Sequence, residues 1–138
     1  MEQLVIHSAV HGAVILMVGL VSGLPFARAI RSDHRVVAWR VVHSGGCMGG
    51  VMLLAVAGVL KLVALPPWAA TLLIALLIAG TYLLVIGMVI AALTGDRGIS
   101  AGGSPWNRTV HWLHGIGTVL ALGGAILLLA GLALAVIR

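Results

Sequence analysis

The residue with the clearest chemical potential is His43, which lies in the run WRVVHSGGCMGG (residues 39–50). At helical spacing, one stripe of this run would carry His43, Gly46, Cys47 and Gly50. An imidazole would then project beside a narrow face with almost no side chains. A planar macrocycle or another helix could approach such a face closely, so cofactor binding and helix packing both stay open from the residues alone.

The composition predicts a membrane protein. Of the 138 residues, 62% are hydrophobic and 8% are charged, whereas soluble domains carry about 25% charged residues. The net charge of +5 does not indicate nucleic acid, because the basic residues lie between apolar segments and form no separate basic domain. We therefore expect contact with the lipid bilayer and no nucleic-acid partner. With Cys47 as the single cysteine, no internal disulfide and no C-x-x-C-H haem attachment can form.

Four long apolar segments predict an all-α integral membrane protein, a four-helix transmembrane bundle in a single domain over residues 1–138. The expected spans are residues 4–24, 37–64, 68–93 and 110–137. We expect the first helix to end at Pro25, which would remove a helical hydrogen bond.

Capping residues suggest where the later helices begin. Ser32 or Asp33 is expected to cap the second helix, which would continue to Leu65 and stop at residues 66–67, both proline. Ser104 is expected to cap the fourth helix, with a proline following in the favoured first turn.

The basic residues predict an orientation. Six of the eight Lys and Arg residues lie in or beside loops 25–36 and 94–109. By the positive-inside rule both loops are expected to be cytoplasmic, with both termini outside the cell inner membrane. His43, His111 and His114 would then share the inner level, and His7 and His11 would lie in the outer half of the first helix.

Histidines inside apolar helices suggest metal chemistry. His7 and His11 could chelate a divalent ion at i, i+4 spacing, but no carboxylate lies in an expected span to complete a zinc or iron set. A haem needs one or two neutral imidazoles, an apolar pocket and basic groups for its propionates. His43 with Arg40 fits a haem better than a bare ion, although each histidine could instead form a hydrogen bond between helices.

The run WRVVHSGGCMGGVMLLAVAGVL (residues 39–60) resembles the same region of the membrane-bound styrene oxide isomerase family, whose motif is a tryptophan followed four residues later by His-Ser-Gly. His11-Gly12 and the run DRGIS (residues 96–100) agree with the family in the same order. The resemblance implies a four-helix homotrimer that holds haem b between subunits through one axial histidine. The matching residue is His43, and the expected cofactor-binding set around it is Trp39, Arg40, Gly46, Cys47 and Gly50.

In that family, as the resemblance implies, ferric haem acts as a Lewis acid that opens an epoxide to an aldehyde. The positions of the family's asparagine, tyrosine and aspartate are matched here by Gly49, Met88 and Gly80, so efficient isomerase activity is not expected. The expected function is a haem protein for redox, sensing or haem handling. The alternatives are an epoxide isomerase, a bis-histidine electron carrier with His111 or His114 as second iron ligand, and a purely structural bundle.

Overall fold

The computed structural model describes residues 1–137. All regular structure in that range is helical, in the order α1 (Glu2–Val21), α2 (Gly23–Ser32), α3 (Val36–Val59), the 3₁₀ turn η1 (Leu60–Leu62), α4 (Pro67–Thr94) and α5 (Pro105–Ile137). Four helical stretches are long and apolar enough to cross a membrane: Glu2–Ser32, Val36–Leu62, Pro67–Thr94 and Pro105–Ile137. The prediction of an all-α, four-helix membrane bundle is therefore confirmed.

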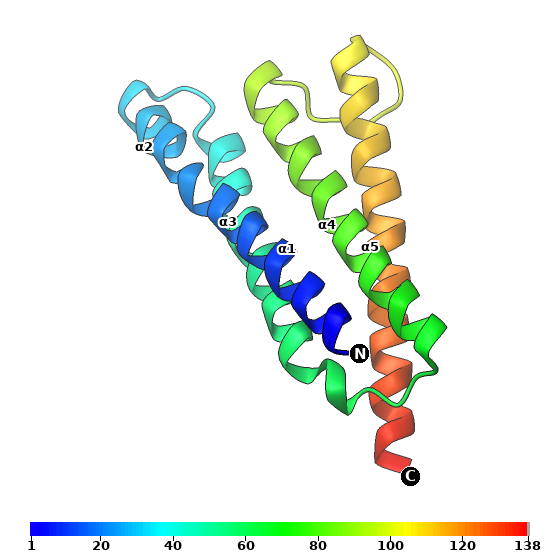
Figure 1. Cartoon of the computed structure of the whole chain (residues 1–138). Helices are drawn as coiled ribbons and strands as arrows, with labels where there is room; N and C mark the ends of the chain where they lie inside the picture. Colours follow the sequence, from blue (N-terminus) through cyan, green and yellow to red (C-terminus); the bar gives the residue numbers. More distant parts are fainter. Residues whose placement is uncertain (138) are drawn as a thin grey trace.

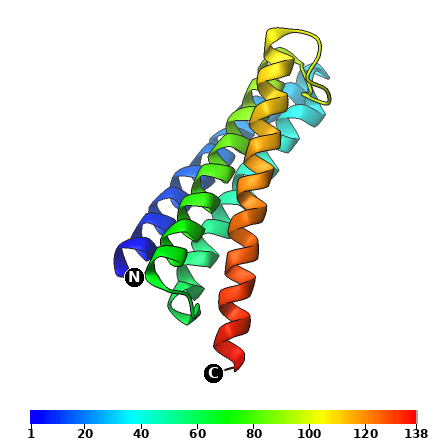
Figure 2. The same cartoon turned by 90° about the vertical axis from the view of Figure 1, so that its right-hand side faces the viewer.

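The helices form two antiparallel hairpins (Figure 1). The first hairpin pairs α1 and α2 with α3, and the second pairs α4 with α5; α4 also contacts α3 and α1 and so joins the two hairpins. The hairpins diverge toward the end that carries the α2–α3 and α4–α5 connections (Figure 1). The start of α1 and the end of α5 lie toward the opposite end, as expected for four alternating passes (Figures 1 and 2).

Glycines bring α1 and α3 into backbone contact. A Cβ added at Gly46 would lie 2.7 Å from the Cα of Gly19, and one added at Gly50 would lie 2.6 Å from the Cα of Leu16. Gly46 and Gly50 are both buried by this contact. Of the two readings that the small-residue stripe left open, the structure shows helix packing for these two glycines.

The helices of the second hairpin, α4 and α5, also approach each other closely at glycines. A Cβ at Gly80 of α4 would lie 2.9 Å from the carbonyl oxygen of Gly117, and a Cβ at Gly117 would lie 3.1 Å from the oxygen of Gly80. Further along, Gly124 of α5 packs against Leu77. Small residues allow such close approach in membrane helices, where van der Waals packing and not water exclusion drives association.

Pro25 does not end the first helix as expected. The helix is interrupted only at Ser22 and continues as α2, in which Pro25 occupies the first turn. The first four N–H groups of a helix have no helical acceptor, so a proline there loses no hydrogen bond. The prediction was wrong because Pro25 begins a second helix and does not terminate the first.

The predicted cap of the second span was also wrong. Ser32 is the last residue of α2, and Asp33 follows it in a left-handed conformation with φ 50°. Arg35, also left-handed with φ 56°, directly precedes α3 and makes no side-chain cap. The two left-handed residues reverse the chain sharply, so α3 begins at Val36.

The second span ends earlier than Leu65. Its last turn is η1, and residues 63–66 form no regular structure, with Val63 and Pro66 extended. Residues 65 and 66 each precede a proline and so avoid the helical region. The N–H of Ala64 instead donates to the oxygen of Gly131 on α5 at 3.0 Å. At the start of α5, the expected cap is confirmed: the N–H of Asn107 donates to the hydroxyl oxygen of Ser104 at 3.0 Å.

Arg35 ties the hairpins together where they diverge. Its guanidinium donates to the carbonyl oxygens of Ala92 and Thr94, each at 3.2 Å, and to that of Leu93. These carbonyls belong to the last turn of α4, where they lack helical partners and where the helix dipole favours a positive charge. The Arg35 side chain therefore completes the end of α4 from the start of α3.

We expect Gly46→Ala to destabilise the protein by about 1–3 kcal/mol, because the new methyl group would meet the backbone of α1, which cannot move aside as a flexible side chain can. Gly58→Ala is the matched control in the same helix, since a Cβ there meets nothing within 4 Å. Thermal unfolding of both variants in detergent measures the difference. Equal melting temperatures for the two variants would contradict the close contact.

Candidate functional site

His43 is held in one orientation by a backbone oxygen. Its Nδ1 lies 2.8 Å from the carbonyl oxygen of Gly19, which also accepts a hydrogen bond from the Ser22 hydroxyl at 2.6 Å. A carbonyl oxygen only accepts, so Nδ1 carries the proton and the neutral ring keeps its lone pair on Nε2. An Nδ1–H donated to a backbone oxygen is the arrangement that orients metal-binding imidazoles.

The Gly19 oxygen is available because of where α1 ends. Gly19 lies in the last turn of α1, and the last four carbonyls of a helix have no helical donor. The close contact of Gly19 with Gly46 brings this carbonyl within reach of His43, which lies one turn before Gly46 on α3. The end of α1 and the glycine contact together position the imidazole.

The His43 ring is partly covered on one side. Phe26 of α2 stacks on it with ring centroids 5.9 Å apart and an interplanar angle of 27°, and Gly23 leaves space beside it. Among the described side-chain nitrogen and oxygen atoms, only His114 Nε2 is both buried and without a hydrogen-bond partner. The Nε2 of half-buried His43 makes no hydrogen bond to the described residues either, so it reaches the accessible surface.

All five residues expected around a cofactor share the helix face of His43, and two of them, Gly46 and Gly50, pack against α1. Trp39, Arg40 and Cys47 fall within about 100° of one another and of His43 around α3, at 100° per residue. Trp39 and Cys47 are half-buried and Arg40 is exposed. Beside Trp39, an apolar groove of about 330 Å³ is also lined by α1 and the start of α2, through Met17, Val18, Val21, Ser22 and Pro25.

The two histidines of α5 do not meet His43 within one chain. His114 lines a cavity together with Val41 of α3, and His43 is two residues from Val41, so it lies on nearly the opposite side of that helix. His111 is bound elsewhere, through Nδ1 to the carbonyl oxygen of Gly98 at 3.0 Å. Helix α3 therefore lies between His43 and His114.

The cavity beside His114 measures about 650 Å³ and lies between the diverging hairpins. Apolar residues of α3 and α4 form most of its wall, and charged residues of the two connections lie at its mouth. The lining is Asp33, Arg35, Val36, Val37, Ala38, Val41, Met88, Ala91, Gly95, Asp96, Arg97 and His114. With two acidic and two basic side chains, the mouth carries no net charge.

The three residues that the sequence resemblance matches to polar positions of the family lie between helices. Gly49 lies against Thr81, whose Cγ2 would be 2.9 Å from an added Cβ, and Gly80 lies against the backbone of α5. The Sδ of Met88 would be 2.7 Å from a Cβ at Gly45. None of Gly49, Gly80 and Met88 has a side-chain N–H or O–H group that could hold a substrate oxygen.

A second polar contact joins the hairpins near the middle of the bundle. The Nδ1 of His11 lies 3.1 Å from the hydroxyl oxygen of Tyr82, and His7 stacks on His11 with ring centroids 6.3 Å apart. His7 is exposed and His11 is half-buried. In the structure His11 thus forms a hydrogen bond between two helices, which is the alternative to metal binding that the sequence left open.

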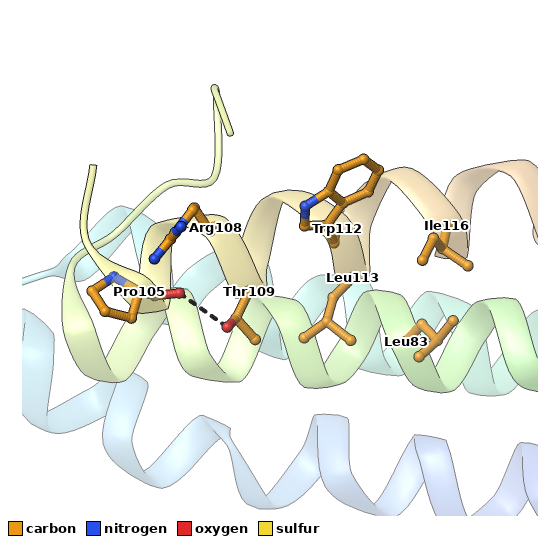
Figure 3. A pocket seen from close by; sticks show the side chains of 7 residues that line it. All are labelled: Leu83, Pro105, Arg108, Thr109, Trp112, Leu113 and Ile116. Atoms are coloured by element: carbon orange, nitrogen blue, oxygen red, sulfur yellow. Dashed lines mark hydrogen bonds between the residues drawn. The ribbon is translucent and has the colours of Figure 1, made fainter. Parts of the chain in front are cut away.

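A third groove, of about 580 Å³, runs along the outer side of α4 and α5 (Figure 3). Its lining is Leu83, Pro105, Arg108, Thr109, Trp112, Leu113 and Ile116. The Thr109 hydroxyl donates a hydrogen bond to the oxygen of Pro105 at 3.0 Å. Arg108 is the only charged residue of this lining. One cation above an apolar wall suits contact with lipid, and the groove holds no acid, base or nucleophile.

Sequence reasoning missed the partners of His43. Neither the Gly19 carbonyl nor Phe26 was expected near it, because both contacts depend on how far α1 and α2 extend. A signal existed in the G-x-x-x-G pair Gly19 and Gly23, which marks the close approach of another helix.

A family model described as styrene oxide isomerase matches residues 6–138, which is nearly the whole chain. No curated protein matches the chain.

Proposed function

The chain belongs to the styrene oxide isomerase family, and from that membership we propose that it binds haem b through His43. The supporting observation is the orientation of this ring: Nδ1 donates to Gly19, and Nε2 keeps an accessible lone pair. Iron binds to such a neutral imidazole nitrogen.

The residues that would hold the haem lie on the same face of α3. Trp39 and Phe26 supply apolar surface beside His43, and Cys47 lies one turn further along. Arg40 is exposed and carries a positive charge that can pair with a propionate. Gly46 and Gly50 act indirectly, because they hold α1 close enough for Gly19 to orient the ligand.

We expect His43→Ala to lose the haem Soret band and still to form a folded membrane protein, since His43 is half-buried and makes one hydrogen bond. Absorption spectra and circular dichroism of the purified variant measure both properties. His34→Ala is the control, because His34 is exposed in the α2–α3 turn. Full haem content in His43→Ala would refute the assignment.

Arg40→Ala should weaken haem retention only modestly, because an exposed ion pair contributes little.

We propose further that the protein does not isomerise epoxides efficiently. A bound ferric haem supplies a Lewis-acidic iron and a one-electron redox centre. Isomerisation also needs protein donors that hold the epoxide oxygen, and Gly49, Met88 and Gly80 provide none. The proposed role is therefore redox, sensing or haem handling. The alternative of an epoxide isomerase is favoured by the family match.

We expect the purified haem-loaded protein to turn over styrene oxide slowly or not at all. Loss of one well-placed donor costs about 3–4 kcal/mol in comparable sites, which is 100-fold to 1000-fold in rate. Gas chromatography of the aldehyde product measures the rate, with His43→Ala as background. Many turnovers per second above that background would place the protein with the isomerases.

The assembly and orientation follow from the same proposal. We infer a homotrimer in the cell inner membrane with haem between subunits, because the family resemblance implies it and His43 Nε2 faces outward from a single chain. The basic connections around Arg31 and Arg97 would be cytoplasmic and both termini outside.

Cysteine labelling in intact cells tests this orientation. With Cys47 replaced by Ala, single cysteines at Arg31 and Gly102 should not react with a membrane-impermeant thiol reagent, whereas one at Glu2 should react. The reverse pattern of labelling would invert the proposed topology.

A further inference from the structure

Two histidines near the divergent end of the bundle share one arrangement. His43 and His111 each donate Nδ1–H to a backbone carbonyl oxygen, at 2.8 Å to Gly19 and at 3.0 Å to Gly98. Each ring therefore presents an Nε2 lone pair. Neither Nε2 has a partner among the described residues, and neither is buried, so both can bind a group that arrives from outside the chain.

The acceptor of His111 is itself held in place. Gly98 has a left-handed backbone with φ 64°, which glycine adopts without strain. Its N–H donates to Oδ1 of Asn107 at 2.8 Å, and Nδ2 of Asn107 donates to the oxygens of Ser100 and Gly102 at 2.8 and 2.7 Å. The α4–α5 connection is thereby folded against the first turns of α5, and the His111 ring is fixed before any ligand binds.

His114, the other histidine of α5, does not share this arrangement. Its Nε2 is buried and makes no hydrogen bond, and a Cβ added at Gly87 would lie 2.7 Å from it. The nitrogen thus rests against the backbone of α4 and is covered by its own chain. Of the two possible second iron ligands on α5, only His111 has Nδ1 bound to a backbone oxygen and an Nε2 that is not buried.

His43 and His111 lie at similar depth but cannot meet in one chain. Gly45 contacts Met88, and the neighbouring Gly87 contacts His114, so these residues define a common level. At 1.5 Å per residue, His43 lies about 3 Å and His111 about 4.5 Å from that level, both toward the basic connections. Because His43 faces α1 and α2 while His111 belongs to α5, a single iron can reach both only across two copies of the chain.

We propose that His111 of a neighbouring copy is the second axial ligand of the iron bound by His43. This inference rests on the haem binding proposed above. It gives a six-coordinate iron with two neutral imidazoles, which leaves no open position for an epoxide and suits electron transfer or sensing. It also assigns a function to the fixed orientation of His111.

Absorption spectra of full-length variants test the ligand. The purified wild-type protein should show a low-spin haem spectrum. His111→Ala should keep the haem and become high-spin, whereas His114→Ala should remain low-spin. His111→Gln serves if the alanine variant does not fold, since it retains a hydrogen-bond donor. A high-spin wild-type spectrum, or a low-spin spectrum in a folded His111 variant, would overturn the proposal.

Mixed oligomers test the second copy. His43→Ala and His111→Ala chains carrying different affinity tags are co-expressed, and assemblies that contain both are isolated. A low-spin fraction should appear, because one chain then supplies His43 and its neighbour supplies His111. Haem that is high-spin only would overturn the arrangement across chains. Loss of haem in His43→Ala is a separate result, and its absence would refute the proposed haem site itself.

Discussion

The contact on which the site depends is the backbone approach of α1 to α3 at Gly19 and Gly46. Each glycine lacks the side chain that would push the other helix away, and a Cβ at Gly46 would lie 2.7 Å from the Cα of Gly19. The same approach places the Gly19 carbonyl 2.8 Å from Nδ1 of His43. The same helix contact therefore packs α1 against α3 and orients the imidazole of His43. A change that separates these helices would remove the hydrogen bond that fixes the tautomer of His43.

The hairpins are joined by fewer and more polar contacts than those within each hairpin. Arg35 donates to carbonyls at the end of α4, and His11 meets the Tyr82 hydroxyl deeper in the bundle. Within the hydrocarbon core a polar group has no water to bond, so the contact between His11 and Tyr82 fixes the relative position of α1 and α4. Between these contacts lies the 650 Å³ cavity beside His114. The divergence of the hairpins is thus bounded by specific hydrogen bonds.

The fold could be predicted because its signals are local and large. Four apolar segments and the basic connections define the spans, and Ser104 followed by Pro105 marks the start of α5. The helix ends near Pro25 and Asp33 were predicted wrongly, since the same residues can begin a helix or reverse the chain, and tertiary contacts decide between these. The orientation of His43 could not be predicted from the sequence for a similar reason. Its partner, Gly19, is 24 residues away and is exposed as an acceptor only because α1 ends there.

Where glycines lie between the helices of this chain, a neighbouring backbone or side chain occupies the space that a side chain would fill. Gly80 and Gly49, which match polar positions of the family, admit α5 and Thr81 respectively. An aspartate at position 80 would carry a Cβ 2.7 Å from the backbone nitrogen of Ala121, so restoring it would force α4 and α5 apart. The packing of α4 against α5 therefore leaves no room for a side chain at position 80. A single substitution there would add a polar group only by altering the bundle.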